Sequence, residues 1–268
     1  MTLAAARGYL AHTAPDRDQI AAWVEQFHRD GFIFLTNVLP PETVAELKAD
    51  LDSVVTEEQV KFRSRIEVAY RMFETSRANL RLFDMEPIVT FAETLINDVT
   101  HVIHNSSFRS PTGGGGIGAW HQDDPPHYLV THGEPPTNVR LPVLICNANY
   151  YLTDVETLAH GPTQFIRGSH LFGKLCPPFL DGTKYGDRLM TCMGPAGSVV
   201  LSNSQVWHHG APNTSDRVRY ITQITYARRI IGHKYYPFMN YEMPEHVYKD
   251  ADERLRRLLG FLPHGAFG

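Results

Sequence analysis

The feature that most constrains the fold is a change in the character of the chain at about residue 101. From there, short stretches rich in β-branched and aromatic residues alternate with clusters of Gly, Pro, Asn and Asp, a pattern typical of strands joined by turns. The expected strands are 101–109, 139–153, 163–167, 197–203 and 217–228. Many short strands in succession predict a sandwich or a barrel over about 101–230.

The first hundred residues have a mainly helical pattern. Residues 17–29 place Ile20, Trp23, Val24 and Phe27 at helical spacing. The run 32–36 resembles a buried strand. Pro40-Pro41 then open a second helix, because proline is tolerated in a first turn. Further helical segments are expected at 57–78 and 87–97.

A helical front followed by strands predicts an α+β protein. No repeat or linker interrupts the chain, so 1–268 is expected to form a single domain. In it, the helix-rich residues 1–100 pack on a β-barrel core of about 101–230. The tail, 231–268, with a helix expected at 251–259, covers the barrel.

Composition excludes several function classes. The net charge of −4 offers no footprint for nucleic acid or an anionic membrane, and no apolar run is long enough to span a bilayer. The start of the chain lacks the pattern of a signal peptide. Three cysteines without CxxC spacing favour a reducing, cytoplasmic setting. A chain of 268 residues can bury a substantial core, and its 14 histidines permit a metal site.

His121-Gln122-Asp123 is the first candidate for such a site. On a strand, residues two apart point to the same face, so His121 and Asp123 can reach one ion. Joined by one distant His, they form the ligand set of non-haem Fe(II) oxygenases. The pair also fits a histidine at the barrel mouth and a turn-forming Asp ahead of two prolines. A second such tripeptide, His28-Arg29-Asp30, lies at an expected helix end and fits a structural role.

A downstream segment strengthens the metal hypothesis. An apolar strand, 197–203, leads to Trp207-His208-His209-Gly210 and then to a strand that carries Arg217 and Arg219. Over most of its length the chain resembles the phytanoyl-CoA dioxygenase-like family of Fe(II)/2-oxoglutarate oxygenases. The more specific marks are Gly168-Ser169-His170 and the run from Trp207-His208 through Pro212-Asn213-Thr214-Ser215-Asp216-Arg217 to Arg219.

The resemblance implies a double-stranded β-helix, a jelly-roll or cupin-like barrel, with His121, Asp123 and His208 as metal ligands. Family members place an arginine that grips 2-oxoglutarate eleven residues past the ligand His, and Arg219 stands at that distance from His208. His209 remains the alternative. Neighbours on a strand face opposite ways, so both histidines cannot readily bind the same ion.

The co-substrate pocket is expected around Arg219. Its planar guanidinium offers two parallel donors to the distal carboxylate of 2-oxoglutarate, which an ammonium cannot match. By resemblance, Asn149, Thr163 and His104 line the same pocket, although Asn149 also fits a role in satisfying backbone groups within the sheet. Arg217 is expected to form an outward salt bridge. Candidate substrate contacts, which equally fit turn or packing roles, are Asp124, His127, Tyr128 and Trp207.

The resemblance implies an Fe(II)/2-oxoglutarate-dependent dioxygenase that uses O2 and forms succinate and CO2. Related halogenases replace the ligand carboxylate with a small residue, so the presence of Asp123 favours hydroxylation of an unactivated C–H bond. The alternatives are a cupin-like metalloenzyme that does not use 2-oxoglutarate and a catalytically inactive binding member of the family. The expected partner is a small metabolite or natural-product intermediate, with no nucleic acid and no membrane. The oligomeric state, monomer or homodimer, stays open.

Overall fold

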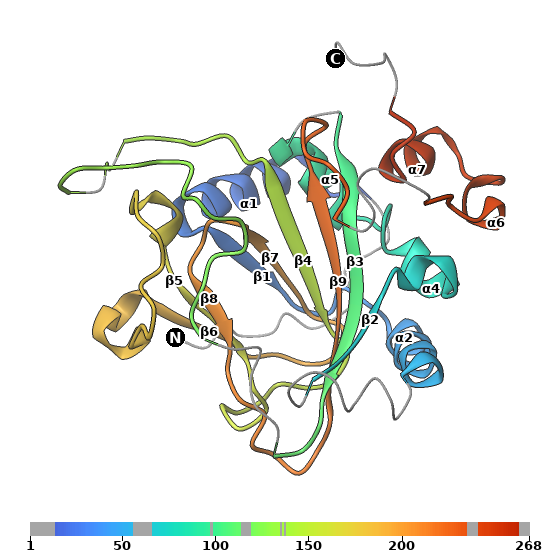
Figure 1. Ribbon diagram of the computed structural model, residues 1–268, viewed down its shortest axis with the longest axis horizontal. Helices are drawn as coiled ribbons and strands as arrows, with labels where there is room; N and C mark the ends of the chain where they lie inside the picture. The colour runs from blue at the N-terminus through green and yellow to red at the C-terminus, as the bar shows by residue number, and fades with distance from the viewer. Residues whose placement is uncertain are drawn as a thin grey trace.

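A computed structural model describes residues 14–55, 66–96, 99–113, 119–134, 136, 138–234 and 241–262 (Figure 1). The helices of the first hundred residues are α1 (Arg17–Asp30), α2 (Pro41–Val54), α4 (Arg77–Arg81) and α5 (Ile88–Ile96), with the short 3-10 turn η1 (Met72–Glu74) before α4. The same region contributes strands β1 (Phe32–Leu35) and β2 (Glu67–Tyr70). The expected helices at 17–29 and 87–97, and the helix that opens at Pro41, are confirmed.

The later strands are β3 (His101–Ser110), β4 (Ile145–Tyr151), β5 (Thr163–Ile166), β6 (Leu189–Cys192), β7 (Val199–Asn203), β8 (His208–Gly210) and β9 (Arg219–Ala227). Two 3-10 segments, η2 (Ser169–Leu171) and η3 (Gly182–Arg188), lie between β5 and β6. The described part of the tail holds α6 (Glu245–Tyr248) and α7 (Glu253–Leu258), and α7 packs beside β3.

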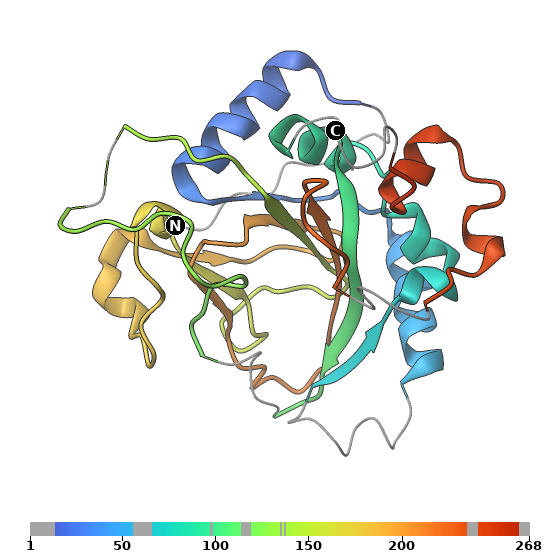
Figure 2. The ribbon, with the colours of Figure 1, turned by 45° about the horizontal axis from the view of Figure 1, so that its top comes forward.

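The strands form two antiparallel sheets. One has six strands in the order β1-β7-β4-β9-β3-β2, and the other has three in the order β6-β5-β8. Figure 2 shows the three-stranded sheet on one side of the six-stranded sheet, and helices α1 and α5 on the other side. The α+β class and the jelly-roll arrangement are therefore confirmed, as two facing sheets rather than one closed barrel.

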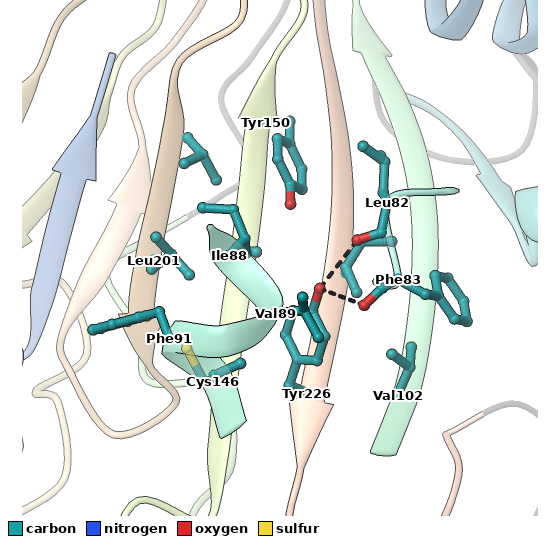
Figure 3. Packing of buried hydrophobic residues seen from close by; sticks show 14 of the residues in the cluster. Leu82, Phe83, Ile88, Val89, Phe91, Val102, Cys146, Tyr150, Leu201 and Tyr226 are labelled. Atoms are coloured by element: carbon teal, nitrogen blue, oxygen red, sulfur yellow. Dashed lines mark hydrogen bonds between the residues drawn. The ribbon is translucent and has the colours of Figure 1, made fainter. Parts of the chain in front are cut away.

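Strand alternation divides the core into two layers. On β1 and β7, Ile33 and Leu201 point to the layer beneath the helices, whereas Phe32 points between the sheets. There the Phe32 ring stacks on Phe165 of β5, with ring centroids 4.3 Å apart. A buried tyrosine ties the helical layer to the sheet, because the Tyr226 hydroxyl donates to the carbonyl oxygens of two residues that precede α5 (Figure 3).

The expected helix at 57–78 is wrong over Glu67–Tyr70. These residues form β2, which pairs with β3, and Val68 lies opposite Phe108. Residues 56–65 lie outside the described residues. The local sequence pattern of such a short segment is weak, so its secondary structure depends on the strand that it pairs with. Sequence periodicity does not reveal that partner. Strands β6 and β8 are too short to give a period of their own. No helix among the described residues is both long and apolar enough to cross a membrane.

Candidate metal and co-substrate site

His121, Asp123 and His208 lie together between the two sheets. Each offers one ligand atom, and these atoms all lie within 4.8 Å of one another. The two histidines face each other through a β-bridge, in which each backbone N–H donates to the other residue's carbonyl at 2.8–2.9 Å. Asp123 Oδ1 is 3.6 Å from Nε2 of both rings. The three residues of the sequence hypothesis therefore converge at one point.

Backbone carbonyls orient both imidazole rings. The Nδ1 of His121 is 2.8 Å from the Ala119 carbonyl oxygen, and the Nδ1 of His208 is 2.9 Å from that of Val206. A neutral imidazole that donates from Nδ1 leaves the Nε2 lone pair free to bind a metal. Because both Nε2 atoms face Asp123, the donor set fits a divalent ion with two imidazoles and one carboxylate on one face.

Burial and hydrogen bonding shift the pKa values of the three cluster residues in different directions. Burial alone would raise the pKa of the Asp123 carboxyl, but the electrostatic interaction with His208 and the hydrogen bond with His121 lower that pKa to about 2. Burial also lowers the pKa of His208. The hydrogen bond to Asp123 raises the pKa of His121. Asp123 is thus ionised and His208 neutral at neutral pH.

His209 points away from the cluster. Its Nε2 is 2.8 Å from Oε1 of Gln164, and its ring packs against Trp120 with centroids 4.2 Å apart. The strand alternation of β8 accounts for this placement, since adjacent side chains lie on opposite faces. The structure therefore brings His208, and not His209, to Asp123.

The residues expected to hold 2-oxoglutarate share the interior face with the metal cluster. Antiparallel partners place their side chains on the same face, and His104 lies opposite Thr225 while Asn149 lies opposite Gln223. Gln223 and Thr225 lie an even number of residues from Arg219 on β9, so their side chains are on the same face of the sheet as that of Arg219. Thr163 reaches the interior from the smaller sheet, where its N–H donates to the Tyr151 hydroxyl.

Arg219 carries a buried positive charge without a hydrogen-bonded carboxylate among the described residues. Its side chain is buried, with only 4% of the residue exposed. Nε and Nη2 have no hydrogen-bond partner among the described residues, and the guanidinium lies over the ring of Tyr151, 5.8 Å from its centroid. Burial lowers the pKa of Arg219. By contrast, Arg217 pairs outward with Glu156 at 3.0 Å, as expected. Buried donors without partners indicate a ligand, because such groups are otherwise nearly always satisfied.

The four residues suggested as substrate contacts lie in different surroundings. Asp124 follows the metal cluster and pairs with Lys234 at 3.2 Å. Tyr128 is 44% exposed, whereas His127 is buried and contacts a backbone carbonyl. The Trp207 ring is fully buried, edge-on to two aromatic rings of the 169–188 segment, on the side away from His208. Contact of these residues with a substrate stays a prediction.

The second His-x-Asp tripeptide, His28-Arg29-Asp30, has a structural role at the end of α1. Asp30 is buried, and its two carboxylate oxygens accept hydrogen bonds from the Arg29 guanidinium.

The sequence hypothesis missed Asn147, whose Nδ2 donates to Asp123 Oδ2 at 2.6 Å. A signal for it was present: Asn147 and Asn149 stand two apart in an apolar strand, the spacing of side chains on a shared face.

Solved structures similar to this fold carry metals and 2-oxoglutarate. HygX from Streptomyces hygroscopicus, solved with nickel and 2-oxoglutarate bound, matches with a TM-score of 0.65 at 14% identity, covering 83% of this chain and 91% of that chain. The epimerase SnoN from nogalamycin biosynthesis, in complex with Fe3+, alpha ketoglutarate and nogalamycin RO, matches with a TM-score of 0.64 at 17% identity, covering 85% and 94%. At these identities the likeness shows the fold alone. No protein of curated function matches the sequence.

Two facing antiparallel sheets around a His-Asp-His cluster define a class, the double-stranded β-helix metalloproteins. Within it the sequence pattern of phytanoyl-CoA dioxygenase (PhyH) matches residues 27–221, most of the chain. The chain belongs to the phytanoyl-CoA dioxygenase family, whose members use Fe(II), 2-oxoglutarate and O2. The expected family is thereby confirmed.

Proposed function

We propose that the protein is an Fe(II)/2-oxoglutarate-dependent dioxygenase that hydroxylates an unactivated C–H bond of a small metabolite or natural-product intermediate. Succinate and CO2 are the co-products. Family membership supports the cofactors, and retention of Asp123 supports hydroxylation over halogenation, since halide binding would need a small residue at that position.

The observation that carries the proposal is the buried Arg219 on the same interior face as the metal cluster. His121, Asp123 and His208 would hold the iron. Arg219 would bind the distal carboxylate of 2-oxoglutarate through its two unpaired nitrogens, a geometry that suits a planar carboxylate. Asn149, Thr163 and His104 would complete the pocket. A metalloenzyme without a 2-oxo acid would leave this arginine buried and unpaired.

The chain's own residues prepare the site for oxidation. When bound, the iron and its 2-oxo acid supply the oxidising power that removes hydrogen from an unactivated carbon. The apolar layer between the sheets covers the cluster on the side of His208, with Phe165 packed against the His208 ring at 5.7 Å between centroids. The carbonyls bonded to both Nδ1 atoms hold the rings in place.

A second outcome is supported by the similarity to SnoN, which is an epimerase. In that outcome hydrogen is removed from one carbon and a hydrogen is delivered to its opposite face, with no oxygen added. An external reductant would supply the two electrons that O2 takes up beyond those from 2-oxoglutarate. The two outcomes give different products. Hydroxylation makes the product one oxygen atom heavier than the substrate, whereas epimerisation leaves the mass unchanged and inverts one stereocentre.

The test has two stages. Anaerobic titration of the protein with Fe(II) and 2-oxoglutarate should produce a metal-to-ligand charge-transfer band in the visible spectrum. Succinate formation is then followed against a panel of metabolites, and the product is analysed by mass and stereochemistry. Absence of the band would refute use of 2-oxoglutarate and leave a cupin-like metalloenzyme or an inactive family member.

A further inference from the structure

We propose that Asn147 and Thr225 form a positioning relay that keeps one oxygen of Asp123 away from the metal. Asp123 then binds the ion through Oδ1 alone. The proposal rests on the proposed function and deepens it, because it names residues that prepare the site for 2-oxoglutarate. Neither residue was expected from the sequence.

The relay is a short chain of hydrogen bonds within the six-stranded sheet. Asn147 Nδ2 donates to Asp123 Oδ2 at 2.6 Å, and Thr225 Oγ1 donates to Asn147 Oδ1 at 2.7 Å. Asn147 on β4 and Thr225 on β9 are direct partners in the antiparallel register, so their side chains lie on the same face. Asn147 is 2% exposed and Thr225 is 1% exposed, so water does not compete for these bonds.

The direction of the relay follows from the chemistry of its ends. An ionised carboxylate only accepts hydrogen bonds, so Asn147 must turn its NH2 group toward Asp123. The amide oxygen of Asn147 then points the other way, where the Thr225 hydroxyl can donate to it. Without that hydroxyl, the amide oxygen of the buried Asn147 would lose its hydrogen-bond donor in the orientation that the carboxylate requires. Thr225 therefore stabilises the orientation of Asn147 that the carboxylate requires, and Asn147 holds Oδ2 of Asp123 in place.

The consequence for the metal site is a carboxylate with one available oxygen. Oδ2 is held by Asn147, whereas Oδ1 faces both imidazoles at 3.6 Å. Two imidazoles and one carboxylate oxygen leave three positions of an octahedral ion open. A bound 2-oxo acid would take two of these positions, and the third would stay available for O2. If Asp123 bound through both oxygens, it would occupy a position that 2-oxoglutarate or O2 needs.

A purely structural role for Thr225 can be separated from this one by a matched threonine on the same strand. Thr222 is also fully buried on β9, and its hydroxyl donates to an asparagine side-chain oxygen, Oδ1 of Asn79, at 2.8 Å. Thr222 lies on the opposite face of the sheet, beneath the helices, and contacts no residue of the metal cluster. Thr222→Val therefore removes at least as much buried hydrogen bonding as Thr225→Val, including a contact with the Ser107 hydroxyl, without touching the relay.

The test measures the affinity of the Mn(II)-saturated protein for 2-oxoglutarate by calorimetry, with the charge-transfer band of the Fe(II) complex as a second readout. Asn147→Leu should weaken 2-oxoglutarate binding about 10–100-fold, the range typical of residues that orient metal ligands, and should shift the band. Thr225→Val should act in the same direction, while Thr225→Ser and Thr222→Val should bind as the wild type does. Thermal denaturation establishes that each variant is folded.

Wild-type affinity in Asn147→Leu, or an equal loss in Thr222→Val and Thr225→Val, would overturn the relay. Should Asn147→Leu fail to fold, the comparison of the Thr225 variants with Thr222→Val decides alone. A wild-type protein that binds Mn(II) but no 2-oxoglutarate would instead refute the proposed function, so the two failures are distinguishable.

Discussion

Replacing Arg219 by methionine should stabilise the ligand-free protein and abolish its stabilisation by 2-oxoglutarate. Methionine keeps an unbranched stem of similar length but removes the charge. In the ligand-free state the guanidinium is buried with two unpaired nitrogens, so the protein bears a desolvation cost that no described carboxylate offsets. The same residue is expected to bind the co-substrate, and a strained binding site commonly carries such a cost.

The size of the effect follows from the burial of the charge. Removing an ion from water costs several kcal/mol in real proteins. The contact with Tyr151 offsets only part of this cost, because a cation–π contact at a desolvated site contributes about 2 kcal/mol. A net gain of about 1–3 kcal/mol is expected, which raises the Tm of a chain of this size by roughly 2–10 °C. Wild-type protein loaded with Mn(II) should gain about 2.7 kcal/mol from 2-oxoglutarate at one hundred times its Kd.

The assay is thermal and urea unfolding of both proteins, with Mn(II) and with or without 2-oxoglutarate. Arg217→Met is the matched control, because Arg217 is half-exposed and already paired with Glu156. Its stability should change by about 1 kcal/mol or less, and 2-oxoglutarate should still stabilise it. If Arg219→Met is less stable than the wild type without ligand, or still gains stability from 2-oxoglutarate, the reasoning about the buried charge is wrong.

Three further predictions address the ligand set, the pH dependence and the backbone. His208→Ala should lose Mn(II) binding in calorimetry, whereas His209→Ala should retain it; loss in the second variant alone would assign the ligand to His209. Burial lowers the pKa of His170 from 6.5 to about 4, so the unfolded chain takes up a proton before the folded protein does. The stability from this residue is complete above pH 6.5 and is lost as the pH falls toward 4. Between pH 7.5 and pH 5 the wild type should lose about 2 kcal/mol that His170→Gln does not lose, measured by urea unfolding, and equal losses would contradict this. Gly197 has a φ of +85°, and a Cβ there would lie 2.3 Å from the Leu39 carbonyl oxygen. Gly197→Ala should therefore cost about 2–4 kcal/mol, and an unchanged melting curve would show that the turn adapts.

Much of the fold could be predicted because its longer elements carry their own pattern. The helix at Arg17–Asp30 has its apolar face, an Asp16 N-cap and a left-handed Gly31 at its end, all of which are local signals. The strand at Glu67–Tyr70 could not be predicted in this way. It exists because β3 offers it hydrogen-bond partners, and that neighbour lies far away in the sequence.

In the candidate site, too, some features follow from local sequence and others from contacts between distant segments. The His-x-Asp spacing suggested that His121 and Asp123 meet at one ion, but the expected strand is wrong there. His121 lies in an isolated β-bridge, and Asp123 lies in a bend where its N–H donates to the Ser204 carbonyl oxygen. Alternation on β8 allows only one of His208 and His209 to join them. Which of the two joins follows from the bridge between residues 121 and 208, a contact between distant segments. The sequence could suggest that choice only through the spacing to Arg219 that the family resemblance implies.

The sequence alone thus determined the donor types, their spacing and the family, because each depends on residues close together in the chain or on a recognisable pattern. The tertiary structure alone decided what surrounds them. It left Arg219 buried with two unpaired nitrogens, and it placed Asn147 and Thr225 behind Asp123. The physical reason is that burial and hydrogen-bond satisfaction belong to the packed sheets, where strands from distant parts of the chain meet, and no local periodicity encodes which polar group finds a partner.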